Sequence, residues 1–151
     1  RANETLLQDN DRGLFVTIWI GQYDTQTGQL TYANGGHPPP YRLDAKGNVH
    51  TFGQVTAPLV GIVEQDVFIQ DEPETLQLEP GDTLLVYTDG IPEAISPEGE
   101  FFHDERFKRL LQHLHGEPVG RLCSLTIEEI NNFQGDESFD DRTLLALQRI
   151  R

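Results

Sequence analysis

The sequence predicts an α+β domain with a largely antiparallel sheet. Short runs of β-branched and aromatic residues, separated by turn signals, fill most of the first 90 residues. Two segments with apolar residues at helical spacing follow at 104–115 and 118–133, and an apolar run at 143–150 closes the chain. Strands, then helices, then one more strand differ from the alternating order of a parallel α/β sheet. Because no repeat or linker interrupts this order, we expect residues 1–151 to form a single domain.

The first part of the chain is expected to form strands joined by turns, after a short helical end at residues 2–7. The strands are predicted at 14–23, 29–33, 41–43, 49–52, 59–63, 67–70 and 75–78. Residues 24–28 and 44–48 are rich in Asp, Gly and Asn, which favour turns, so each predicts a hairpin between the strands beside it. Two glycines and three prolines in 34–40 exclude a helix or central strand there.

The second part begins with a turn at Glu79-Pro-Gly-Asp82, where Pro occupies the second position. Residues 83–87 are strongly apolar and predict a central strand that ends at Thr88-Asp89-Gly90. We expect a short helix at 91–95, because Pro92 is tolerated in a first helical turn. The amphipathic helix at 104–115 and a second helix at 118–133 lead to the closing strand.

The composition excludes several classes of partner. The chain has 25 Asp and Glu against 11 Lys and Arg, a net charge of −14, which argues against nucleic acid and against an anionic membrane surface. No apolar run approaches the ~20 residues that span a bilayer, and no signal peptide is evident. One Cys excludes an internal disulfide and a Cys-based zinc site, which favours a cytoplasmic protein. The chain lacks Met and begins at Arg1, so we expect a piece of a longer protein.

Two carboxylate segments are candidate metal ligands. Asp89 follows the buried strand at 83–87, and Asp140 and Asp141 come shortly before the closing strand. Taken alone, Asp89-Gly90 is more typical of a turn and 134–141 of a solvated acidic loop. Together, the two segments could meet at one end of a sheet, where carboxylate oxygens suit hard cations such as Mg²⁺ and Mn²⁺.

His37 is a further candidate, as a ligand, a base or a phosphate contact. Its place in the Gly- and Pro-rich corner Asn34-Gly-Gly-His-Pro-Pro-Pro40 favours a structural role, in which the loop is hydrogen-bonded to itself.

Five motifs together carry a resemblance to a known family. They are Phe15-Val-Thr, the segment from Gly28 to Pro40 that includes Asn-Gly-Gly-His-Pro, Pro58-Leu-Val-Gly-Ile62, Leu78 to Ala94 with its Thr-Asp-Gly, and Asp140-Asp-Arg-Thr-Leu-Leu145. In this order and spacing the chain, from about residue 3 onward, resembles the metal-dependent PPM-type serine/threonine protein phosphatases of the SpoIIE-like bacterial branch.

The resemblance implies a four-layer α–β–β–α sandwich of mostly antiparallel sheets with two Mn²⁺ or Mg²⁺ ions at one end. By position, Asp89 and Asp140 match family metal ligands, and Asp141 would be an auxiliary ligand. A water bridging the metals would hydrolyse phosphoserine or phosphothreonine on a regulatory protein, such as an anti-sigma-factor antagonist. A sensor or receiver domain would precede the catalytic module.

The chain departs from the family at its beginning. The family opens with an acidic strand and an Asp-x-x-Gly-His-Gly segment, which this sequence does not contain. We therefore expect the phosphatase domain to lack its N-terminal strands, and the fragment to be inactive alone. Two alternatives stay open: a non-catalytic interaction module on the same scaffold, and an acidic β-rich ligand-binding domain.

Overall fold

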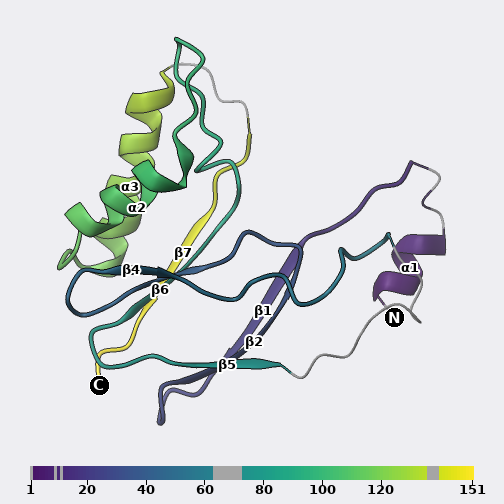
Figure 1. Cartoon of the computed structure of the whole chain (residues 1–151), viewed down its shortest axis with the longest axis horizontal. Coiled ribbons are helices and arrows are strands. Elements are labelled where there is room, and N and C mark those ends of the chain that lie inside the picture. The colour runs from purple at the N-terminus through teal and green to yellow at the C-terminus, as the bar shows by residue number, and fades with distance from the viewer. Residues whose placement is uncertain (1, 9, 11, 63–72, 136–139) are drawn as a thin grey trace. The chain divides into compact units, whose positions relative to one another are not determined.

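A computed structural model describes residues 2–8, 10, 12–62, 73–135 and 140–151 (Figure 1). The chain divides into two compact units, one of Arg1–Pro39 with Gly53–Gln77 and the other of Pro40–Phe52 with Leu78–Arg151. All pairings between the named strands are antiparallel, and helices accompany them. The predicted α+β class is confirmed.

The first unit is built on a three-stranded sheet. Its elements are α1 (Ala2–Gln8), β1 (Ile18–Tyr23), β2 (Gln29–Gly35) and β5 (Glu74–Gln77), with the strand order β1-β2-β5. Asp24 shapes the turn between β1 and β2, because its carboxylate accepts hydrogen bonds from the backbone N–H groups of Gln26 at 2.8 Å and Thr27 at 3.2 Å. The hairpin predicted around residues 24–28 is confirmed.

β1 lies at the edge of the sheet that the described residues form, and it carries exposed apolar side chains. Ile18 is 39% exposed and Ile20 60%, and Phe15, just before the strand, is 55% exposed. In β2, by contrast, Leu30 and Tyr32 are buried at alternate positions, as expected for a strand with one covered face. An apolar strand edge of this kind favours pairing with a further strand.

The second unit combines a four-stranded sheet with two helices. The strands are β3 (Tyr41–Leu43), β4 (Val49–Thr51), β6 (Thr83–Tyr87) and β7 (Leu144–Gln148), in the order β4-β3-β6-β7, and the helices are α2 (His103–His113) and α3 (Val119–Gln134). The apolar faces of these elements form one core, in which Leu85, Phe107, Leu111 and Ile130 are fully buried. Both helices and the closing strand were predicted close to these bounds.

Three predicted strands differ from the structure or lie outside the described residues. β1 begins at Ile18 rather than at residue 14. Residues 59–62 form only an isolated bridge, in which Val60 and Val16 exchange hydrogen bonds of 2.9 and 3.0 Å before Gly61 turns the chain at φ 94°. The predicted strand at 67–70 lies outside the described residues.

Residues 91–95 form turns, not the predicted helix. The N–H of Glu93 does bond to the carbonyl of Asp89 at 2.9 Å, as in a helical turn. The carbonyl of Ala94, however, accepts the N–H of Phe102 at 2.8 Å, and Ile95 bridges Phe101. A helix that continued here would pair the N–H of Ser96 with the carbonyl of Pro92, but Ser96 donates to Glu100 and Pro92 accepts from His103, both at 2.8 Å.

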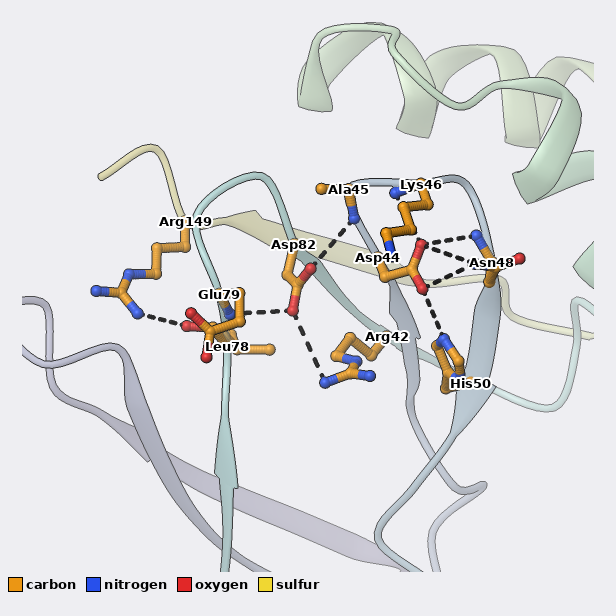
Figure 2. A network of polar contacts seen from close by, with 10 residues as sticks. All are labelled: Arg42, Asp44, Ala45, Lys46, Asn48, His50, Leu78, Glu79, Asp82 and Arg149. Carbon is orange, nitrogen blue, oxygen red and sulfur yellow. Dashed lines mark hydrogen bonds and ion pairs between the residues drawn. The ribbon is translucent and has the colours of Figure 1, made fainter.

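A polar network holds the Thr83 end of β6 against the β3–β4 hairpin (Figure 2). The buried carboxylate of Asp82 accepts the backbone N–H of Glu79 at 3.0 Å and of Ala45 at 3.2 Å, and lies 3.8 Å from the Arg42 guanidinium. Arg149 donates to the carbonyl of Leu78 at 2.6 Å. These contacts fix the turn at 79–82, which the sequence predicted.

Asp44, in the same network, is expected to make stability depend on acid. Its hydrogen bond from His50, at 2.8 Å, and bonds from Asn48 and the Lys46 N–H hold the pKa of Asp44 well below its usual range. A carboxyl whose pKa is lower in the folded state than in the unfolded state stabilises the fold at pH values above the unfolded pKa, which is about 3.9 for Asp. This stabilisation is lost as the pH falls from there through the pKa of the folded state. Asp44→Asn should therefore lower the Tm at pH 7, by a difference that shrinks below about pH 4 in thermal melts. A constant difference across this range would contradict the role of Asp44.

Gly120, in the first turn of α3, offers a site for stabilisation. A Cβ there would meet no atom within 4 Å, and its backbone is helical. Alanine loses less conformational freedom than glycine on entering a helix, so Gly120→Ala should raise the free energy of unfolding by about 0.5–1 kcal/mol. Urea denaturation measures this change, and an unchanged or lower stability would contradict it.

Candidate metal site at the end of β6 and β7

The antiparallel register of β6 and β7 brings the two acidic segments to the same end of the sheet. Tyr87, the last residue of β6, pairs with Leu144, the first residue of β7. Asp89 follows β6 by two residues, and Asp140 and Asp141 precede β7 by four and three. The convergence that the sequence allowed is therefore present in the fold.

Thr88 ties the two segments together, a role the sequence analysis missed. Its N–H donates to the carbonyl of Thr143 at 3.1 Å, and its hydroxyl accepts the N–H of Thr143 at 2.9 Å. The same hydroxyl donates to the carbonyl of Asp141 at 3.0 Å. A Thr before Asp-Gly is common in turns, so the sequence alone held no signal for these contacts.

Gly90 allows the close approach of the two segments. A Cβ at this position would lie 2.5 Å from the carbonyl oxygen of Asp141 and 3.1 Å from its carbonyl carbon. Side chains do not tolerate such distances to backbone atoms, so a residue without a side chain is needed here. The glycine of Thr-Asp-Gly is thus required by packing, although its φ is not positive.

Arg142 anchors the second acidic segment to α3. Its guanidinium donates to the side-chain oxygens of Asn131 at 2.8 Å and of Gln134 at 3.0 Å, and Gln134 is 4% exposed. Sequence reasoning noted Arg142 only as part of a motif, because its partners lie on a different element. This anchor holds the backbone that carries Asp140 and Asp141.

The carboxylates themselves are exposed at this end of the sheet. Asp89, Asp140 and Asp141 all face solvent, and Asp140 accepts the N–H of Asp141 at 2.7 Å. Across the described residues, no group of three or more His, Cys, Asp or Glu side chains is placed to hold a metal ion. The structure thus brings the predicted ligands together as a pair of segments, not as a complete coordination shell.

Aromatic packing supports the strand that ends at Asp89. The hydroxyl of Tyr41 donates to Asp104 at 2.6 Å, and that of Tyr87 lies 3.4 Å from the same oxygen. The rings of Tyr87 and Phe107 meet edge to face at 5.0 Å. Burial raises the pKa of Tyr87 to about 12, so its hydroxyl stays neutral. The packing of its ring against Phe107 holds the end of β6 just before Thr88.

His37, in the other unit, has the structural surroundings that the sequence favoured. Asn34 is fully buried; its Oδ1 accepts the N–H of His37 at 2.8 Å, and its Nδ2 donates to the carbonyls of His37 at 2.9 Å and Gly53 at 2.8 Å. The His37 ring lies 3.3 Å from the Thr17 hydroxyl. Asn34, which the sequence analysis did not single out, is the residue that organises this loop.

Comparison with known proteins places the chain in a family. The family model described as Stage II sporulation protein E (SpoIIE) matches residues 1–150. The chain belongs to the SpoIIE family. It is also 33% identical over 142 residues to Protein IcfG of Synechocystis sp. (strain ATCC 27184 / PCC 6803 / Kazusa), covering 94% of this chain and 22% of that protein.

A second sequence relative and a solved structure are also similar to this SpoIIE-family chain. It is 25% identical to phosphoserine phosphatase RsbU of Bacillus subtilis (strain 168), covering 97% of this chain and 43% of RsbU. The crystal structure of the RsbU and RsbW domains of Rv1364c from Mycobacterium tuberculosis superposes with a TM-score of 0.77 at 28% identity, covering 96% of this chain and 39% of that one. The chain therefore spans less than half the length of these relatives.

Among the helices described, none is long and apolar enough to cross a membrane.

Proposed function

We propose that this chain is part of the catalytic domain of a metal-dependent protein serine/threonine phosphatase. The observation that carries the proposal is the convergence of Thr88-Asp89-Gly90 with Asp140-Asp141-Arg142 at one end of β6 and β7. The substrate is a phosphoserine or phosphothreonine on a regulatory protein, such as an anti-sigma-factor antagonist. Similarity to RsbU, a phosphoserine phosphatase by name, supports this substrate class.

The donor chemistry of this site fits a hard divalent cation. Exposed carboxylate oxygens are the ligands that Mg²⁺ and Mn²⁺ prefer, and metal dependence is general among phosphatases of this family. We assign Asp89 and Asp140 as metal ligands and Asp141 as an auxiliary ligand for two Mn²⁺ or Mg²⁺ ions. When bound, such ions lower the pKa of water to yield a nucleophile and neutralise charge on the phosphoryl group.

The protein's own contribution to the mechanism is positioning. Thr88 and Gly90 hold the two acidic segments in register, and Arg142 fixes the second of them to α3. Ligands whose backbone is fixed in this way need not reorganise as substrate binds, which favours catalysis by preorganisation.

We further propose that the chain is a single phosphatase domain completed in the parent protein by strands preceding Arg1. Two observations support this: the apolar edge at β1, and the lack, among the described residues, of any three or more His, Cys, Asp or Glu side chains placed together to hold a metal ion. Strands added at this edge would cover Ile18 and Ile20, and a further carboxylate would complete the ligand set. The parent would be cytoplasmic, with a sensor or receiver domain upstream.

The second candidate function is a non-catalytic interaction module, which the incomplete acidic cluster favours. Calorimetric titration of the parent protein with MnCl₂ separates the two. The phosphatase proposal expects Mn²⁺ binding that Asp89→Asn abolishes, whereas the module expects no binding by either protein. Titrating the 151-residue chain alongside tests its completeness, since we expect it to bind Mn²⁺ weakly and not to hydrolyse p-nitrophenyl phosphate.

A further inference from the structure

α2 and α3 of the second unit line a groove of about 570 Å³, and none of the residues of the acidic site belongs to its lining. Its apolar lining comes from Phe102, Leu110 and Phe133. Phe102 is 4% exposed and packs edge to face on Phe133, with 5.1 Å between ring centroids. This apolar floor has a size and character suited to an apolar anchor side chain.

One wall of the groove is cationic. Arg106, Arg109 and His113 stand three and four positions apart on α2, so they lie along one side of the helix. Glu129 of α3 is the one carboxylate among the described residues of the lining, and Glu100, outside the lining, pairs with Arg106. In a chain with a net charge of −14, two arginines on one side of a helix are a local departure from the general trend.

The two arginines are available to an incoming carboxylate. Arg109 donates through Nε to the carbonyl of Glu105 in its own helix, at 3.2 Å, and forms no ion pair with any described carboxylate. Arg106 lies 5.0 Å over the ring of Phe133 and pairs at 3.0 Å with Glu100, whose side chain is 66% exposed. An exposed pair of this kind contributes little stability, so a partner's carboxylate can replace Glu100.

We propose that the α2–α3 groove binds an acidic amphipathic helix of a separate partner protein. An apolar side chain of that helix would lie on the half-buried Leu110 and Phe133, with Asp or Glu residues three to four positions apart pairing with Arg106 and Arg109. The acidic remainder of this chain repels such a helix, which directs it to the groove. The interface lies outside the proposed phosphatase site and does not depend on metal.

A peptide selection on the parent protein tests the proposal. A displayed library of random 16-residue helical peptides is first selected for binding to the wild-type protein. Peptides that also bind the double variant Arg106→Glu/Arg109→Glu are then removed, and the remaining ones are sequenced. The retained peptides should carry acidic residues at spacings of three or four with an apolar residue between them. In fluorescence anisotropy, the double variant and the milder Arg109→Gln should weaken binding, the former at least tenfold, and added salt should weaken it further.

Arg121→Glu is the matched control. Arg121 also lies on the surface of a helix, pairs with Glu117 at 3.0 Å and does not line the groove, so its reversal should leave the affinity within twofold. Circular dichroism verifies that each variant is folded. Failure to retain peptides after depletion, retention of basic or neutral ones, or equal effects of Arg109→Gln and Arg121→Glu would overturn the proposal. Self-association of the parent protein that Arg109→Gln removes would overturn it in favour of a second copy as the occupant.

Discussion

Asp89→Asn in the complete parent protein is expected to lower metal-dependent hydrolysis of p-nitrophenyl phosphate by about 100-fold or more. Losing a residue that merely orients a metal ligand costs about 10–100-fold, and the loss of a ligand should exceed this. The substitution removes one negative charge while keeping the size of the side chain. Because Asp89 is exposed, folding should be little affected, and a near-normal Tm would locate the defect in the site.

Glu128→Gln is the control for the loss of one negative charge. Glu128 is exposed on α3 and is not part of the acidic site, so its substitution should leave the rate within twofold. If Asp89→Asn retained activity comparable with this control, the assignment of Asp89 as a metal ligand would be wrong. That result would leave the proposed completion by upstream strands intact, provided that the extended protein is active and the 151-residue chain is not.

The elements that the sequence predicted are those whose signal is local. Phe107 and Leu111 repeat at helical spacing within α2, and the run at 83–87 is apolar enough to mark a buried strand. The prediction of a helix at 91–95 was wrong because the backbone of this segment pairs with a later one, as the Ala94 carbonyl does with the N–H of Phe102. A pairing partner several residues away leaves no trace in helical periodicity.

The acidic site shows the same division between local and distant information. Asp89 and Asp140 could be selected because each stands beside an apolar strand, and antiparallel pairing of those strands brings them together. Thr88 and Arg142 could not, since their roles arise from the carbonyl of Asp141 and the side chains of α3. The division into two units was equally hidden, because the hairpin formed by β3 and β4 belongs to the second unit despite its early place in the chain.

Gly90→Ala should damage both stability and activity, although it changes no charged group. The added Cβ would meet the backbone of Asp141, which cannot move aside as a flexible side chain could. Overpacking of this kind costs about 1–3 kcal/mol in the free energy of unfolding. Relief of the clash requires the 140–142 segment to move away from Asp89, and a displacement near 1 Å can cost about 100-fold in rate.

Gly120→Ala separates this steric effect from the general effect of replacing a glycine. Neither position has a positive φ, but only Gly90 faces a backbone carbonyl at 2.5 Å, whereas Gly120 faces open space. Both variants should be measured in the parent protein. In urea denaturation, Gly90→Ala should lower the free energy of unfolding and Gly120→Ala should raise it. In Mn²⁺-dependent hydrolysis, only Gly90→Ala should lower the rate. Equal stability of the two variants would mean that the Asp89 and Asp141 segments do not approach as closely as their contacts indicate, and the proposed metal site would lose its structural basis.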